Sequence, residues 1–99
     1  MSRKQETTYQ NLLKKKIEKL LPGCYITKND ANETQGVPDL LILHNNKWAM
    51  LEIKISKQAS KRPNQEYYIN KFNEMSYAAF VYPENEDEVL DALQRTLKV

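Results

Sequence analysis

The chain has 99 residues, of which 40% are hydrophobic, and carries a formal net charge of +2. This length predicts one domain, residues 1–99, that can bury enough surface to fold alone. No apolar run approaches the ~20 residues of a membrane span and no signal peptide is evident, so we expect a cytoplasmic protein without a membrane partner. Cys24 is the only cysteine, which excludes an internal disulfide and suits a reducing compartment.

The charges are unevenly distributed along the chain. Residues 1–83 carry 13 Lys and Arg against 8 Asp and Glu, whereas residues 84–99 carry 2 against 5. A basic face favours the phosphate backbone of nucleic acids, although an ordinary solvated surface would explain the same distribution.

Residues 6–22 show the periodicity of an amphipathic helix that ends at Pro22-Gly23. Glu6 falls within the apolar stripe and Glu18 on the opposite face, so Glu6 is predicted to point inward. An inward acid near a helix start either complements the helix dipole or joins a functional site.

A short strand is predicted over residues 24–28, followed by a polar loop over residues 29–35. The loop leads into Gly36-Val37-Pro38, where glycine permits close approach of backbone or ligand and proline fixes φ before the next residue. Lys28 and Asn29 are the best candidates for contacts between this loop and DNA, and an uninvolved connection is the alternative.

Two apolar runs, 40–43 and 48–55, flank a polar tetrad, which predicts a strand, a tight turn and a strand. Asn tolerates positive φ, so Asn45-Asn46 can form a two-residue turn. A turn centred there places Asp39 directly opposite Glu52 on the ladder. Because both faces of these strands are apolar, we expect helices above and below the sheet.

The facing carboxylates of Asp39 and Glu52 are the strongest chemical signal. Like charges on one rung are destabilising, so one of the two pKa values should be raised unless a cation joins them. With the backbone carbonyl of Ile53 they form a hard oxygen site suited to Mg²⁺ or Mn²⁺. Lys54 shares their face and can orient a water or offset charge on a phosphate. The alternative is an exposed hairpin edge with a Glu–Lys pair.

A polar, basic connection follows and contains three further candidates for DNA contacts: Lys57, Lys61 and Arg62. Pro63 is predicted to start a second helix. Gln65 lies near the centre of its apolar face, so its side chain either caps local backbone groups or reaches the site.

Residues 77–82 are predicted to form the last strand, which Pro83 ends. Asn85 and Glu88 are predicted to form the capping box of a final helix. The acids at the start of that helix suit the positive end of its dipole, so we assign them no chemistry.

The candidate residues form an ordered set: Glu6, Gly36, Pro38-Asp39, Glu52-Ile53-Lys54 and Gln65. This set resembles the PD-(D/E)XK nuclease superfamily and, within it, the VRR-NUC group, over roughly residues 5–95. The resemblance implies an α/β (α+β) fold with a restriction-endonuclease-like core, in the order α-β-β-β-α-β-α, and a small mixed sheet flanked by helices.

The resemblance also implies hydrolysis of phosphodiester bonds with Mg²⁺ or Mn²⁺. Asp39, Glu52 and the carbonyl of Ile53 would hold the metal, and Lys54 would act on the attacking water. Glu6 matches the acid near the start of the first helix, and Gln65 matches a glutamine beside the catalytic lysine.

Stand-alone, phage-type members of the group act as homodimers on Holliday junctions and other branched DNA. The resemblance therefore implies a structure-specific DNA endonuclease that works in the nucleoid or the host cytoplasm. Two other functions remain open: a catalytically weak DNA-binding module of a replication or repair complex, and a protein-interaction subunit whose hairpin is only structural. Cleavage assays on linear, flapped and four-way DNA distinguish them.

Overall fold

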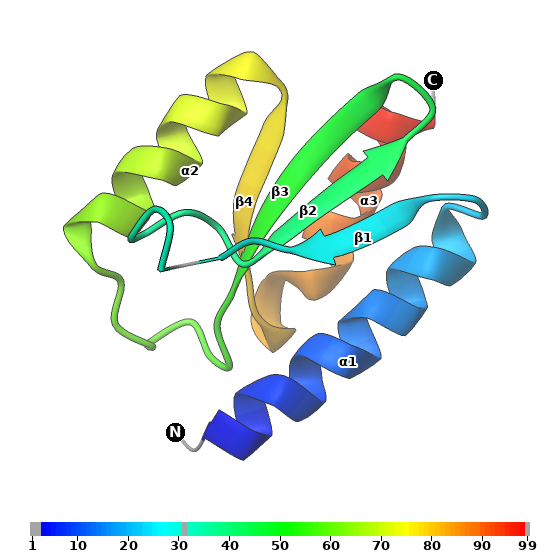
Figure 1. Cartoon of the computed structure of the whole chain (residues 1–99). Coiled ribbons are helices and arrows are strands. Elements are labelled where there is room, and N and C mark those ends of the chain that lie inside the picture. The colour runs from blue at the N-terminus through cyan, green and yellow to red at the C-terminus, as the bar shows by residue number, and fades with distance from the viewer. Residues whose placement is uncertain (1–2, 31, 99) are drawn as a thin grey trace.

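The structure, a computed structural model, describes residues 3–30 and 32–98, with side chains from residue 5 onward. The elements along the chain are α1 (Arg3–Leu20), β1 (Tyr25–Lys28), β2 (Leu40–His44), β3 (Lys47–Ile53), α2 (Pro63–Met75), β4 (Tyr77–Val81) and α3 (Glu86–Leu97). The predicted order of helices and strands is confirmed, and Figure 1 shows it along the chain.

The strands form one mixed sheet in the order β1-β2-β3-β4. β1, β2 and β3 pair antiparallel, whereas β4 runs parallel to β3, so α2 serves as the crossover between them. Asn45 adopts a φ of 59°, and the turn pairs His44 with Lys47 and Leu40 with Leu51. This is the predicted register of the hairpin.

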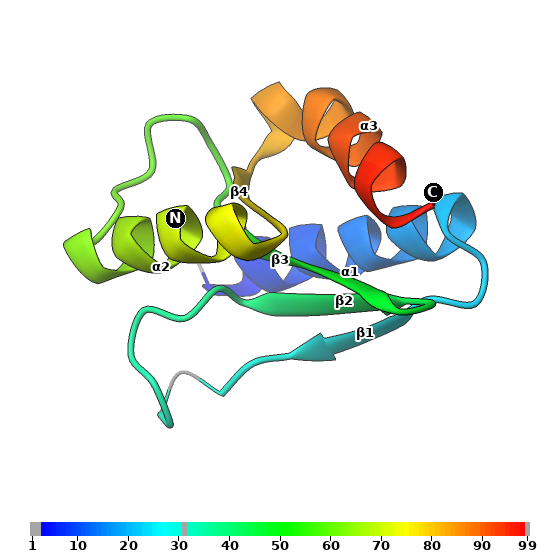
Figure 2. The same ribbon diagram turned by 90° about the horizontal axis from the view of Figure 1, so that it is seen from above.

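Helices cover both faces of the sheet, as predicted. On one face α1 and α3 enclose the main core, which contains Leu13, Ile17, Leu21, Leu40, Ile42, Ala49, Leu51, Ile53, Val81, Val89, Leu90, Leu93 and Leu97. On the other face α2 packs against β3 and β4, with the ring of Phe72 edge-on to that of Trp48. Figure 1 shows α2 and α1 on opposite sides of the strands, and Figure 2 shows α3 next to α1.

Asn85 occupies the predicted N-cap position of α3, but the predicted capping box is wrong, because the Asn85 side chain makes no hydrogen bond to the helix. A 3₁₀ turn, Pro83–Asn85, precedes the helix, and the side chain of Asn85 closes this turn instead of capping the helix. Its Oδ1 accepts a hydrogen bond from the Tyr82 N–H at 2.9 Å, and its Nδ2 donates to the Phe80 carbonyl at 3.0 Å. Both polar atoms of the Asn85 side chain therefore bond to the backbone at the end of β4, and neither is left to cap α3.

Glu86, the first residue of α3, has a role beyond complementing the helix dipole. It is only 9% exposed, and it accepts hydrogen bonds from the hydroxyl of Tyr9 at 2.8 Å and from the ammonium of Lys16. A buried carboxylate with these partners ties α3 to α1, and no sequence pattern indicated it.

His44 closes the opposite end of the sheet. Its Nδ1 lies 3.0 Å from the Leu97 carbonyl and its Nε2 lies 3.3 Å from the Pro22 carbonyl, which connects the end of β2 to the ends of α3 and α1. In the described part of the chain, no helix has the length and apolar character needed to span a membrane.

Candidate functional site

Asp39 and Glu52 lie together where β2 begins and β3 ends, at the open end of the hairpin. Asp39 directly precedes β2, and its Oδ2 accepts a hydrogen bond from the Ile53 N–H at 3.0 Å. The two side chains are close enough for the charge of Asp39 to raise the pKa of Glu52. The pairing predicted from the turn therefore brings the two acids together.

Glu52 is 4% exposed, which is unusual for an ionisable side chain. Burial, and next the negative charge of Asp39, raise the pKa of Glu52 from 4.5 to about 8, while the positive charge of Lys54 acts in the opposite direction. The prediction that one of the two carboxyl groups has a raised pKa is confirmed. A cation bound to both acids would relieve their repulsion.

Lys54 follows the last residue of β3 and is held at both ends. Its backbone N–H donates to the Val81 carbonyl at 2.9 Å, and its Nζ donates to Oε1 of Gln65 at 3.0 Å. The Nζ also lies 3.9 Å from Oε2 of Glu52, with the lysine side chain 14% exposed. The ammonium group is thus fixed beside the carboxylate pair.

Gln65, in the first turn of α2, both caps local backbone groups and reaches the site, the two alternatives left open by the sequence. Its Oε1 accepts a hydrogen bond from the Arg62 N–H at 3.1 Å, which caps the start of the helix. The same oxygen accepts from Lys54, and Nε2 donates to Oε2 of Glu52 at 3.2 Å. One amide therefore joins α2 to the lysine and to the buried acid.

The loop that enters β2 is held against the same turn of α2. Gly36 has a φ of +92°, and a Cβ at this position would lie 2.6 Å from Cγ of Asn64. The Nδ2 of Asn64 donates to the Gln35 carbonyl at 3.2 Å. A close approach was predicted at Gly36 for backbone or ligand, whereas in the structure the side chain of Asn64 in α2 makes it.

The donor set around Asp39 and Glu52 fits Mg²⁺ or Mn²⁺. In an extended strand the N–H and C=O of one residue point to the same side, so the Ile53 carbonyl faces the edge on which its N–H meets Asp39. All three donors are oxygen, and Mg²⁺ commonly takes one or two carboxylates and completes its shell with water and phosphate.

Glu6 is half-buried in the first turn of α1. Among the residues that the structure describes, no three His, Cys, Asp or Glu side chains are placed to hold one metal ion. The structure therefore does not gather Glu6 with Asp39 and Glu52 into a three-acid cluster, and its role in the site stays a prediction.

Solved structures similar to this chain include a VRR_NUC domain, which is 23% identical with a TM-score of 0.67 and covers 91% of this chain and 94% of its own. Another is a VRR_NUC domain protein, 20% identical with a TM-score of 0.66, where the match covers 94% of this chain and 88% of that one. This chain has the VRR_NUC fold. No protein-family model and no curated protein matches the sequence.

The basic candidates surround the site end of this VRR_NUC fold. The side chains of Lys28, Lys57, Lys61 and Arg62 are exposed. The Nζ of Lys61 lies 4.8 Å from the centre of the Phe80 ring, and Phe80 pairs with Glu52 in the β3–β4 register. The connection between β3 and α2 is therefore anchored beside the buried acid.

Asn29 differs from the other predicted DNA contacts because its side chain is half-buried. Its Nδ2 donates to the Pro38 carbonyl at 2.8 Å, and its backbone N–H donates to the Asp39 carbonyl at 2.9 Å. The structure thus shows Asn29 in contact with the backbone that carries a site acid, and its contact with DNA stays a prediction.

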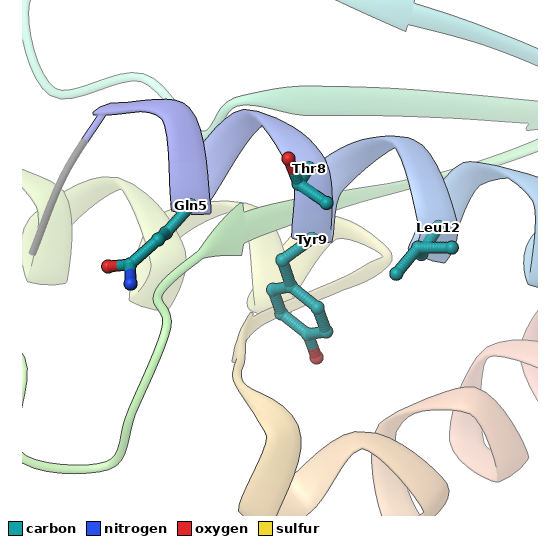
Figure 3. A pocket seen from close by; sticks show the side chains of 4 residues that line it. All are labelled: Gln5, Thr8, Tyr9 and Leu12. Carbon is teal, nitrogen blue, oxygen red and sulfur yellow. The ribbon is translucent and has the colours of Figure 1, made fainter.

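The VRR_NUC fold also has an apolar hollow beside α1, lined by Gln5, Thr8, Tyr9 and Leu12 (Figure 3). None of these residues belongs to the carboxylate site. We assign no chemistry to this hollow, because it lacks the charged groups that the site end of the sheet provides.

Proposed function

We propose that this protein is a metal-dependent endonuclease that hydrolyses phosphodiester bonds in DNA, with Holliday junctions and other branched DNA as its substrates. The observation that carries the proposal is the pair formed by the buried Glu52 and the half-buried Asp39, with Lys54 fixed beside it. A fold shared with VRR_NUC domains supports the same assignment.

Asp39, Glu52 and the Ile53 carbonyl would hold Mg²⁺ or Mn²⁺. The bound ion would polarise the scissile phosphate and lower the pKa of a water ligand. Asp39 is oriented for this by the Ile53 N–H, which occupies one of its oxygens and fixes the plane of the carboxylate.

Lys54 would orient the attacking water or offset the charge that develops on the phosphate. Gln65 keeps the ammonium of Lys54 in place because the amide contacts both the lysine and Glu52. Glu6 would assist with the metal or the water, since it lies in the first turn of α1, as the resemblance requires.

The DNA backbone would be contacted by the exposed side chains of Lys28, Lys57, Lys61 and Arg62. Figure 2 shows the segments that follow β1 and β3, in or next to which these residues lie, on opposite sides of α2. A homodimer would supply two sites for the two strands of a junction. The dimer and the preference for junctions are proposed from the resemblance to stand-alone VRR-NUC nucleases.

Single-turnover cleavage of linear, flapped and four-way DNA, with Mg²⁺ or EDTA, tests the proposal. Asp39→Ala, Glu52→Ala and Lys54→Ala should each nearly abolish cleavage. Glu18→Ala is the matched control, because Glu18 is an exposed acid on α1. Glu6→Ala should resemble the first group, and equal small losses for Glu6 and Glu18 would remove Glu6 from the site.

Binding in EDTA separates the proposed enzyme from its rivals. Affinity for a four-way junction should fall steeply as salt rises, because Lys and Arg release counterions from phosphates. Tight binding without any cleavage in Mg²⁺ would favour a DNA-binding module, and the absence of both would favour a protein-interaction subunit.

A further inference from the structure

The segment from Asn29 to Asp39 is closed by hydrogen bonds that Asn29 itself donates. Its backbone N–H and side-chain Nδ2 donate to two successive carbonyls, those of Asp39 and Pro38, at 2.9 and 2.8 Å. Both acceptors belong to the backbone that positions the Asp39 carboxylate. Pro38 is fully buried, so this backbone has no solvent to supply the hydrogen bond that Asn29 makes.

We propose that Asn29 is a positioning residue for Asp39, an inference that rests on the proposed function. By fixing the Pro38 and Asp39 peptide units, Asn29 directs the Asp39 side chain to the Ile53 N–H and to Glu52. The amide acts through backbone groups, so it need not touch the metal or the DNA.

The segment between these two residues has few contacts that would fix it in place. It is polar, and the hydrogen bonds among its described residues are short-range, such as that from the Glu33 N–H to the Asp30 carbonyl. Further along the segment, the Gln35 carbonyl accepts a hydrogen bond from the side chain of Asn64 in α2. Without the Nδ2 of Asn29, the buried Pro38 carbonyl would lose its side-chain donor.

Two neighbouring amides provide a metal-free measurement of the position of Asp39. The Ile53 N–H donates to Asp39, whereas the Lys54 N–H donates to the Val81 carbonyl on the other side of β3. Hydrogen exchange in EDTA therefore reports the Asp39 contact through Ile53, with Lys54 as an internal reference. A general loss of stability accelerates both amides, and only a local loss changes their ratio.

Asn29→Ala should raise the ratio of Ile53 to Lys54 exchange by about tenfold, as expected for a weakened bond to a charged acceptor. Mn²⁺ affinity of the Asn29→Ala protein should fall by about tenfold, the scale of outer-shell changes at metal sites. Asn32→Ala, an exposed asparagine of the same loop, should change neither quantity.

Junction affinity in EDTA at fixed salt should be unchanged in Asn29→Ala. A loss of that affinity, with the exchange ratio and Mn²⁺ binding equal to those of Asn32→Ala, would make Asn29 a DNA contact and overturn the inference. No change in any of the three would also overturn it. If the wild type neither binds Mn²⁺ nor cleaves DNA, the proposed function fails, while the exchange ratio still decides whether Asn29 positions Asp39.

Discussion

A carboxylate as deeply buried as that of Glu52 favours its protonated form, and here a second acid adds to the effect. The hydrogen bond from Gln65 and the nearby charge of Lys54 compensate only in part. In the metal-free protein, ionisation of Glu52 is therefore unfavourable, so the free energy of unfolding should depend on pH.

Because burial and Asp39 raise the pKa of Glu52 from 4.5 in the unfolded chain to about 8, the folded state binds a proton more tightly. The associated stability is fully present below pH 4.5 and is lost as the pH rises to 8. Glu52→Gln removes this dependence. In EDTA we expect the variant to lose less free energy of unfolding than wild type over that interval, and to be the more stable protein at pH 8.

Urea unfolding at a series of pH values measures this difference. Glu18→Gln is the control, since it removes a carboxylate that is exposed on α1 and should leave the slope unchanged. If wild type and Glu52→Gln show the same slope between these pH values, the buried acid is not the group that titrates.

The individual residues differ in how far sequence alone could predict them. Asp39 and Glu52 could be paired because a two-residue turn determines which residues of a hairpin face each other. The hydrogen bonds of Asn29 and Glu86 could not be predicted because their partners lie elsewhere in the chain, and a contact with a carbonyl or a distant hydroxyl leaves no local pattern. Asn85 was misjudged because a 3₁₀ turn competes for its side chain with the helix cap.

At the scale of elements, the first turn of α2 meets both strands of the hairpin. Asn64 holds the loop that enters β2, and its neighbour Gln65 holds the residues that end β3. This arrangement favours a glycine at position 36, because a Cβ there would lie 2.6 Å from Cγ of Asn64 and the Asn64 side chain would have to shift.

Two glycines allow the contribution of this contact to be measured separately from that of backbone conformation. Gly23 and Gly36 both have positive φ, +88° and +92°, but only Gly36 has atoms within 4 Å of an added Cβ. Gly23→Ala should lower the free energy of unfolding by about 1–2 kcal/mol, the cost of a positive φ for a residue with a Cβ. Gly36→Ala should destabilise the protein more, because the Asn64 side chain must also shift, and we expect this shift to disturb the neighbouring Gln65 and reduce cleavage.

Thermal melts of both variants, compared with single-turnover rates, test this expectation. Each kcal/mol should lower Tm by about 4–8 °C in a domain of this size. Equal losses of stability, with unchanged cleavage in Gly36→Ala, would show that Asn64 gives way without disturbing Gln65.

At the scale of the whole molecule, α1 is joined to α3 by side chains that lie 77 residues apart in sequence. Burial, together with the hydrogen bond to Glu86, raises the pKa of Tyr9 and keeps its hydroxyl protonated as the donor. The same helix carries Glu6 three residues earlier, so this link also determines where the start of α1 lies.

Tyr9→Phe should lower the free energy of unfolding by about 1.5–3 kcal/mol, the range for a hydrogen bond to a charged group. Tyr25→Phe is the matched control, because Tyr25 is 63% exposed on the edge strand. Chemical denaturation of the two variants gives the comparison. Equal stabilities would mean that Lys16 alone satisfies Glu86.

The fold as a whole was more predictable than its details, for a physical reason. Alternating and continuous apolar runs, Pro63 at a helix start and the Asn45-Asn46 turn are local signals, and they agree with one another. The choice of β4 as the parallel partner of β3 depends on packing between elements, and no local signal specifies it.

The hairpin also has a consequence for the order in which the chain assembles. A two-residue turn lets β2 and β3 pair within microseconds, whereas β4 must wait for α2 to cross over. Asp39 and Glu52 would then repel each other in the folding transition state, before Gln65 arrives. We expect Glu52→Gln at pH 8 in EDTA to accelerate refolding more than it slows unfolding. Stopped-flow kinetics would contradict this assembly order if only the unfolding rate changed.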